Sequence, residues 1–569
     1  MLTTLKKIKI SPFRLGLLLT VLIALLASLP LFKSGYFTMH DDVQVMRLYQ
    51  MERCFQDGQI PCRWVPDMGG NYGHPLYNYH PVFAYYLGAF FRLFGLSFIA
   101  ISKILFLLTF LLPTIFIYLL VNTFLGVPAA LAAAAFFTFA PYHSLDVYVR
   151  GAMTESWGIV FFPAIFLSLY RLAQEPKKPL YFILSTLSLA GLFLAHNIMT
   201  MLFTPIALVW GFYWFITNGN LKHLLRLIAT FALAVGLSAF FLLPAFLERS
   251  LVKIDTLTTD YYNFRHHYAS LRQLFLDRSW GYGPSRPGVD DQLSFQLGWP
   301  HWWLSLAGLF ASLILFLKKR SSAITRLAIF ASLLYMASVF MTHAKSVYLW
   351  ELVPLLSFVQ FPWRFLGLAM FAGALLFALL FALIPSRFRW PVSLILSAAI
   401  VIMNFSYFTP EKHFPDMTDQ LKLSGEEYRI QSLATILDYI PTQVKDHPDS
   451  LAPVLPWVVE GEADISQFRK RSNFWRFTVN NSSNQPAVVR VPVFDFPHWI
   501  VLLDQQPIEF HSDNPGGVIE FTIPPGQYTA VGRFTNTPLR SVANLITLSS
   551  FAILLIFTIH TAKKHENKK

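Results

Sequence analysis

About twelve stretches of mostly apolar residues, each close to the length of a membrane-crossing helix, limit most strongly how this chain can fold. A helix needs roughly 20 apolar residues to cross the bilayer, because each residue rises about 1.5 Å across a hydrocarbon core of about 30 Å. Of the 569 residues, 54% are hydrophobic and 14% charged. We therefore expect a polytopic α-helical membrane protein, with spans near 12–32, 98–122, 127–141, 155–172, 180–195, 199–217, 226–245, 302–317, 325–342, 365–384, 390–408 and 541–561.

The basic residues predict the orientation of these spans. They gather at alternate connections, in six clusters: Lys6 to Arg14, Lys177 and Lys178, Lys222 and Arg226, Lys318 to Arg326, Arg387 and Arg389, and Lys563 to Lys569. Cytoplasmic loops carry such an excess, so both termini are expected in the cytoplasm of a bacterial-type cell, with the protein in its inner (plasma) membrane. The net charge of +13 then reflects topology, and no nucleic-acid partner is expected.

With this orientation, the outer loops of the transmembrane domain (1–408) are 33–97, 142–154, 246–301 and 343–364. Residues 81–95 are apolar but short, and they are interpreted as an interfacial or re-entrant helix within the first of these loops. A cleaved signal peptide is an alternative for the first span, given its basic start and the small residues near Ala27.

Segment 409–540 has the composition of a small extracytoplasmic β-sandwich domain. Runs such as Phe474 to Val479 and Val518 to Ile523 are rich in β-formers, and turn signals such as Pro524-Pro525-Gly526 separate them. Residues 541–569 then form the final span and a basic cytoplasmic tail. The aromatic residues Trp457, Trp475 and Trp499 are expected in the core of the sandwich rather than on a ligand-binding surface.

Two adjacent aspartates, Asp41 and Asp42, lie just beyond the first apolar span. Carboxylates at a membrane surface can take a proton from an attacking hydroxyl or hold a divalent cation. Alternatively, they cap the amphipathic segment Val43 to Phe55, since an aspartate satisfies free N–H groups at a helix start. No cofactor is certain from the sequence, and a metal at the acidic pair stays open.

Further polar residues lie close to the outer membrane surface. Arg150 and Glu155 stand between two spans, where they either serve a site or form a structural clamp. Arg364 follows Trp363 at the start of another span, and its planar fork suits a phosphate, with contact to lipid headgroups as the alternative. Other candidates are Lys103 within a span, His196 and Asn197 at a span end, and His74, Tyr77 and His80 in the first outer loop.

The two cysteines of the chain, Cys54 and Cys62, both lie in the first outer loop. An extracytoplasmic pair this close is a disulfide candidate, although spacing alone does not fix the geometry. The chain has too few cysteines for a zinc-binding pattern built on them.

The chain resembles the GT-C superfamily of membrane glycosyltransferases. The resemblance is carried by the acidic pair, by HPLYNYHPVFAYYLGAFFRLFG in the first outer loop, by YVRGAMTE at 148–155, AHN at 195–197 and QFPWRF at 360–365, and by FPHWIVLLDQQPIEF and IPPGQYTAVGRF in the β-rich segment. These stretches are similar to the YfhO-like branch and to membrane proteins called pyruvoyl-tetrahydropterin-synthase-related, a label that does not describe their chemistry.

The resemblance implies an inverting sugar transfer on the outer face of the membrane. The donor would be a polyprenyl-phosphate-linked sugar, and the acceptor a cell-envelope glycan, lipid or protein. Asp41 or Asp42 would be the general base, with Arg364, Arg150 and Lys103 on the donor phosphate. The residues Glu155, His196, Asn197, His74, Tyr77 and His80 would support them.

Two other functions are compatible with the sequence. A lipid-linked saccharide transporter or polymerase would be expected to carry more charged residues along a path through the bundle. A non-catalytic membrane scaffold would be expected to scatter the polar residues around its rim.

Overall fold

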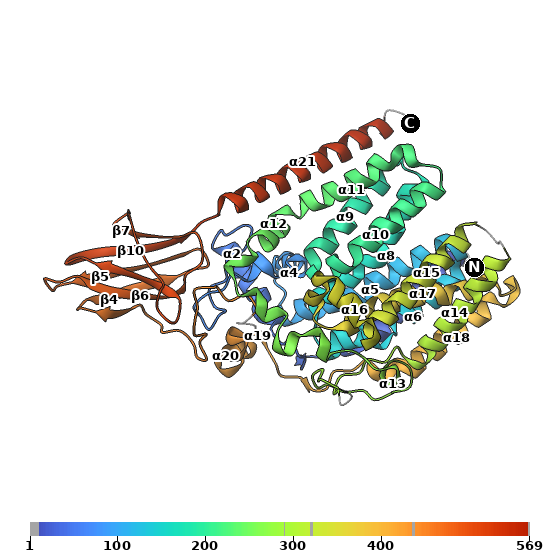
Figure 1. The fold of residues 1–569 in the computed structure, drawn as a ribbon, viewed down its shortest axis with the longest axis horizontal. Coiled ribbons are helices and arrows are strands. Elements are labelled where there is room, and N and C mark those ends of the chain that lie inside the picture. Colours follow the sequence, from blue (N-terminus) through green and yellow to red (C-terminus); the bar gives the residue numbers. More distant parts are fainter. Residues whose placement is uncertain (1–10, 289–290, 319–321, 435–437, 567–569) are drawn as a thin grey trace, which may run out of the picture.

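The chain forms a helical bundle that carries a β-domain at one end (Figure 1). This computed structural model describes residues 11–288, 291–318, 322–434 and 438–566. Among them, eight helices are long and apolar enough to cross a membrane. These are α5 (Phe98–Leu125), α8 (Met153–Gln174), α10 (Asn197–Thr217), α14 (Trp299–Leu317), α15 (Ser322–Thr342), α17 (Leu366–Leu379, in the longer span Pro362–Ala382), α18 (Arg389–Asn404) and α21 (Pro538–Glu566). The protein is therefore an integral membrane protein.

The other apolar helices are bent or short. Helices α11 (Leu224–Leu237) and α12 (Ala239–Leu247) meet at an angle of 76° and make a ninth span if they are counted together. Helices α1 (Pro12–Ala27), α6 (Val127–Thr138) and α9 (Pro179–Ala195) have 16, 12 and 17 residues, less than a full crossing requires. Each of the twelve expected spans contains one of these helices, but twelve crossings stay a prediction.

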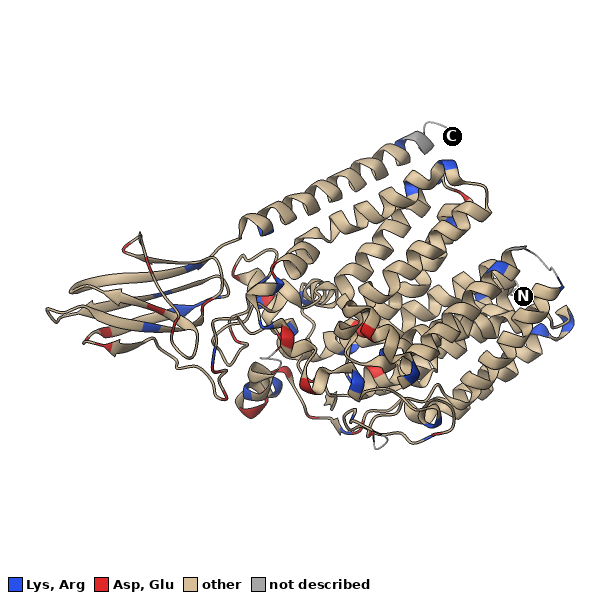
Figure 2. Ribbon diagram, in the orientation of Figure 1, with Lys and Arg blue, Asp and Glu red and all other residues tan. Residues whose placement is uncertain are grey.

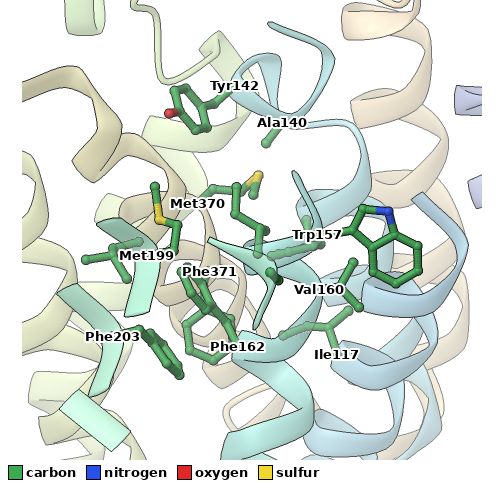
Figure 3. Packing of buried hydrophobic residues seen from close by; sticks show 14 of the residues in the cluster. Ile117, Ala140, Tyr142, Trp157, Val160, Phe162, Met199, Phe203, Met370 and Phe371 are labelled. Carbon is green, nitrogen blue, oxygen red and sulfur yellow. The ribbon is translucent and has the colours of Figure 1, made fainter. Parts of the chain in front are cut away.

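Helix α17 forms the centre of the bundle, since all of its 14 residues are buried. Its Phe371 packs against Phe162 of α8 and Phe203 of α10, and the latter two rings stack at a centroid distance of 4.0 Å (Figure 3). Pro362 begins the turn that leads into this helix, because proline is pre-shaped for a helix start. This rigid central helix fixes the position of Arg364 at its beginning.

Short helices of the first outer loop cover the end of the bundle that lies next to the β-domain. Helix α2 (Gln44–Gln56) follows the aspartates, and α4 (Phe83–Arg92) has only 10 residues, too few to cross a membrane. Just after α4, Leu93 and Phe94 are 80% and 68% exposed, as suits an interfacial element. The structure joins Cys54 and Cys62 in a disulfide.

The β-domain is a sandwich of two antiparallel sheets. One sheet has the order β4 (Asp464–Lys470), β5 (Phe474–Asn481), β10 (Gly526–Phe534), β7 (Trp499–Leu503), β8 (Gln506–Ile508), and the other β3 (Trp457–Glu460), β6 (Ala487–Phe494), β9 (Val518–Ile523). Trp475 of one sheet faces Phe521 of the other, with 6.1 Å between the ring centres, and both Trp475 and Trp499 are buried. These two tryptophans are core residues, as expected, whereas Trp457 is half-buried.

Contacts at both ends of the β-rich segment attach it to the bundle. Strand β1 (Tyr36–Phe37) in the first outer loop pairs with β2 (His413–Phe414) at the beginning of the linker. At the other end, Arg540 of α21 donates from Nε to Glu248 Oε2 at 2.8 Å, just after α12. Arg540 is fully buried, and its guanidinium packs over the rings of Phe496 and Phe534 of the β-domain.

The described part of the chain begins and ends at the end of the bundle remote from the β-domain (Figure 1). Figure 2 shows the helix ends there coloured mainly by Lys and Arg, whereas most acidic positions lie toward the β-domain. Positive charge at one end of a bundle is typical of the cytoplasmic side. The side of the membrane that each end faces stays a prediction.

Close packing between α14 and α17 yields a stability prediction. A Cβ at Gly308 would lie 2.4 Å from the backbone oxygen of Leu376, so Gly308→Ala must push the two helices apart. We expect a loss of about 1–3 kcal/mol and a lower melting temperature of the purified protein. Gly516→Ala is the matched control, since the nearest atom to its Cβ is 3.7 Å away. An unchanged melting temperature for Gly308→Ala would contradict the close contact.

Candidate active site

A cavity of about 600 Å³ opens among helix ends and outer-loop segments. Its wall combines the turn before α2, the junction of α9 and α10, the end of α12 and the start of α17. Of the candidates from the sequence, it is lined by Asp41, Arg150, Arg364, His80, His196 and Asn197. Residues more than 300 positions apart in the chain thus share one chamber.

Arg150 and Arg364 are joined by a buried carboxylate beneath the wall. Glu155 Oε2 accepts from Arg150 Nη2 at 2.9 Å and from Arg364 Nε at 3.2 Å. Arg150 also pairs with the buried Asp146, and the Tyr142 hydroxyl donates to Glu155 Oε1 at 2.5 Å. The clamp between Arg150 and Glu155 is therefore present, and two carboxylates offset the two guanidinium charges.

The remaining contacts of Arg364 fix its direction. Its Nη1 donates to the carbonyl of Val359 at 2.8 Å and to Gln360 Oε1 at 2.9 Å. Gln360 has a φ of 67°, a left-handed conformation that a non-glycine residue adopts only when its surroundings hold it. Within the described part of the chain, Arg364 Nη2 makes no hydrogen bond. One edge of this guanidinium is thus available to a ligand in the cavity.

Asp41 faces the cavity with its backbone firmly held. The Asp41 amide donates to the carbonyl of Arg150 at 2.9 Å, and Gln44 Nε2 donates to the carbonyl of Asp41 at 3.2 Å. Helix α2 has Val43 as its N-cap residue, without a side-chain cap bond. The capping alternative is therefore wrong for Asp41, and its carboxylate is exposed to the chamber.

Asp42, the other aspartate that the sequence offers as a base, points away from the cavity. Its Oδ2 accepts from Lys422 Nζ at 2.7 Å, and Lys422 also contacts Glu427. Burial raises the pKa of Asp42, and the charge of Lys422 opposes that rise. Asp42 is not among the lining residues of the cavity.

The acidic pair does not fit a divalent cation. Asp42 is neutralised by a lysine, and the described residues contain no group of three or more His, Cys, Asp or Glu side chains placed to hold a metal ion. Hard cations need several oxygen ligands directed at one point. We therefore derive no chemistry through a metal here.

Three more candidates lie outside the cavity wall. Lys103 Nζ donates to the carbonyls of Lys33 at 2.7 Å and Gly35 at 3.0 Å, because its position near the start of α5 brings it under the first outer loop. The Tyr77 hydroxyl donates to the carbonyl of Arg47 at 2.6 Å, and buried His74 pairs through its backbone with Val65. Lys103 is thus not placed to bind a donor phosphate, and Tyr77 and His74 hold the loop together.

The three remaining candidates on the wall, His80, His196 and Asn197, have structural partners as well. His196 Nδ1 accepts from the Met199 amide at 3.0 Å and caps α10, while Asn197 Nδ2 donates to the carbonyl of Tyr79 at 3.0 Å. His80 Nε2 lies 3.3 Å from the Tyr85 hydroxyl. Their direct roles in a reaction stay predictions.

Asp438 is a cavity residue that sequence reasoning missed. It follows α20 (Gly425–Leu433) in the linker to the β-domain and lines the same cavity as Asp41. Burial raises its pKa to about 6, although the nearby Arg47 guanidinium opposes the rise. Asp438 accepts no side-chain hydrogen bond within the described residues. The pattern around it, TILDYI, resembles a strand, so nothing local marks it as a site residue.

Arg249 is the second missed residue, and it lies at the edge of the cavity after α12. It is exposed, and among the described residues it has no ion-pair partner. Its guanidinium lies 5.2 Å from the ring centre of Phe246, and Phe246 and Leu247 are 62% and 56% exposed. An unpaired cation therefore stands beside apolar side chains at the mouth of the chamber.

Comparisons with known proteins give distant likenesses. No family model matches the chain. An uncharacterised protein of Lactococcus lactis subsp. cremoris is 22% identical over 237 residues, which are 40% of this chain and 38% of that protein. The chain thus matches well under half of this relative's length.

Among solved structures, the chain is similar to the arabinofuranosyltransferase AftD from Mycobacteria, with a TM-score of 0.39 and 15% identity over 71% of this chain and 27% of that one. It is also similar to the Archaeoglobus fulgidus oligosaccharyltransferase in its apo form, with a TM-score of 0.41 and 13% identity over 75% of this chain and 57% of that one. At these scores, the likeness carries no argument about activity.

The raised pKa of Asp438 predicts how stability depends on pH. The folded protein binds this proton near pH 6 and the unfolded chain only near pH 4, so folding is favoured as pH falls from 8 to 5. We expect Asp438→Asn to remove this part of the pH dependence and to stabilise the protein at pH 8 by about 1–2 kcal/mol, since cavity water screens the charge. Melting curves at pH 5 and 8 measure the difference. An equal change at both values would contradict the assignment.

Proposed function

We propose that this protein is a membrane glycosyltransferase of GT-C type, which moves a sugar from a polyprenyl-phosphate donor to an extracytoplasmic acceptor with inversion. The observation that carries the proposal is the shared cavity, where an exposed carboxylate, Asp41, meets the guanidinium groups of Arg249 and Arg364. Sugar transfer from a phosphate needs a base for the attacking hydroxyl and positive charge for the departing phosphate. The carboxylate and the guanidinium groups are suited to these two tasks. The resemblance in sequence to YfhO-like proteins agrees with it.

The charge balance of the cavity supports a donor with a single phosphate. Four arginines line the wall, namely Arg47, Arg150, Arg249 and Arg364, together with the carboxylates of Asp41 and Asp438. Glu155 and Asp146 offset two of these arginines from beneath, so four positive groups meet four acidic ones. A phosphodiester adds one negative charge to this neutral wall and a diphosphate adds two, so the wall favours the donor with the smaller charge.

In the reaction we propose, the acceptor hydroxyl attacks the anomeric carbon of the donor sugar. Asp41 takes the proton of that hydroxyl, a new glycosidic C–O bond forms, and the bond between the anomeric carbon and the phosphate oxygen breaks. The electron pair of that bond leaves with the lipid phosphate, which Arg249 and Nη2 of Arg364 stabilise. Attack opposite the leaving phosphate inverts the anomeric centre.

The position of Arg249 suits a donor that enters from the bilayer. The apolar side chains of Phe246 and Leu247 beside it are exposed on a helix of the bundle, where they can contact a lipid chain. The phosphate of such a lipid would then lie next to the guanidinium. In this proposal the cavity and the β-domain face the outside of the cell, and both termini are cytoplasmic.

The two alternative functions agree less well with this arrangement. A scaffold was expected to scatter Asp41, Asp42, Arg150 and Arg364, whereas all of them except Asp42 line one chamber. A transporter was expected to have charged residues along the bundle. The cavity instead draws its charged residues from loops and helix ends, at positions 41, 47, 150, 249, 364 and 438.

The two neighbouring aspartates give a matched test of the base. We expect Asp41→Asn to lower sugar transfer by at least about a hundredfold, because the variant has no general base, while Asp42→Asn keeps most of the activity. The assay supplies membranes containing each variant with radiolabelled polyprenyl-phosphate glucose, galactose, mannose or arabinose and measures label in envelope material. Full activity of Asp41→Asn would refute the assignment.

A second test concerns the donor phosphate. Arg249→Gln is expected to raise the KM for the lipid-linked donor about ten- to a hundredfold, since a charge-assisted hydrogen bond contributes about 1.5–3 kcal/mol. Arg265 is the matched control, because it lies in the same outer loop, pairs with Glu351 and is not among the lining residues of the cavity. Equal effects of Arg249→Gln and Arg265→Gln would contradict a specific role for Arg249.

A further inference from the structure

A second hollow, of about 320 Å³, lies between α10 and α11 and shares no lining residue with the candidate active site. Its wall is made entirely of apolar side chains: Leu208, Val209, Phe212, Leu224, Leu227 and Ile228. Val209, Phe212 and Ile228 are 59%, 47% and 57% exposed. Apolar side chains that are exposed on membrane-crossing helices face lipid, so hydrocarbon must fill this groove.

The groove ends at a turn that carries positive charge. The 3-10 turn η3 (Leu221–His223) connects α10 to α11, and its Lys222 is exposed. Two hydrogen bonds bring the turn between α8 and α9 alongside: Asn220 donates to the carbonyl of Ala173 at 2.8 Å, and Arg226 donates to that of Pro176. Exposed Lys177 is therefore held near Lys222.

The two lysines have no acidic partner among the described residues. The nearest carboxylate in sequence, Glu175, pairs with Lys178. Lys177 and Lys222 thus leave about two positive charges uncompensated at the head of an apolar groove. This combination has the chemistry of a lipid with an anionic head and an apolar tail.

We propose that the groove binds one anionic phospholipid, with an acyl chain against α10 and α11 and its headgroup between Lys177 and Lys222. A zwitterionic lipid can fill the groove with the same hydrocarbon, but its headgroup leaves the lysine charges unbalanced. The site therefore distinguishes lipids by charge. This inference requires no assumption about the reaction in the larger cavity.

Native mass spectrometry of the full-length protein, with phosphatidylglycerol or phosphatidylcholine added, tests the proposal. We expect one phosphatidylglycerol to be retained at least about fivefold more strongly than phosphatidylcholine, and Lys177→Gln or Lys222→Gln to weaken its retention about fivefold each. Equal retention of the two lipids by the unaltered protein would overturn the proposal.

Three further variants distinguish binding in the groove from a general attraction between the lipid and positive charge. Ile228→Trp and Val209→Trp fill the groove without changing charge, and each is expected to weaken retention of phosphatidylglycerol. Arg387→Gln removes an exposed charge in the turn that precedes α18, away from the groove, and should leave retention unchanged. If Arg387→Gln weakens binding as much as Lys222→Gln, or if neither tryptophan weakens it, the proposed site is wrong.

Discussion

The bundle end that forms the cavity depends on one buried carboxylate. Glu155 at the start of α8 holds Arg150 from the preceding turn and Arg364 from the start of α17. A charge buried in this way needs partners, and the removal of one partner from a buried pair typically costs about 3–5 kcal/mol. The three groups therefore stabilise one another only when α8, α17 and the turn between α7 (Pro141–Ser144) and α8 are packed together. The backbone of that turn also holds Asp41, through the carbonyl of Arg150.

The sequence was most informative about the helices and about the separate β-rich segment. Long apolar runs have no stable place outside a bilayer or a large core, so each expected span contains a helix. The alternation in Phe474–Asn481 likewise appears in its burial, with Trp475, Phe477 and Val479 inside. The number of membrane crossings was harder to predict from the lengths of the apolar runs. Gly126 separates α5 from α6, which has only 12 residues, and the chain bends at Ser238 between α11 and α12.

The site was only partly predictable, because it is assembled by tertiary contacts. Asp41 and Asp42 are adjacent in sequence, yet one faces the cavity and the other faces Lys422, which lies 380 positions away. Lys103 is drawn to carbonyl groups of the loop above it rather than to a cavity. Asp438 reaches the chamber only because the linker folds back over α2, where Gln431 accepts a hydrogen bond from the Met46 amide. No local pattern encodes these contacts.

Through the contact between Arg540 and Glu248, the final helix also stabilises part of the chamber wall. Glu248 closes the helix that forms part of the chamber wall, and besides Arg540 it accepts hydrogen bonds from Thr537 at 2.6 Å and Asn78 at 3.1 Å. A shortened protein that ended before Thr537 would keep every lining residue of the chamber but would leave this acid without its cation. A division of the chain before the final helix would therefore break this buried ion pair rather than cut a flexible linker.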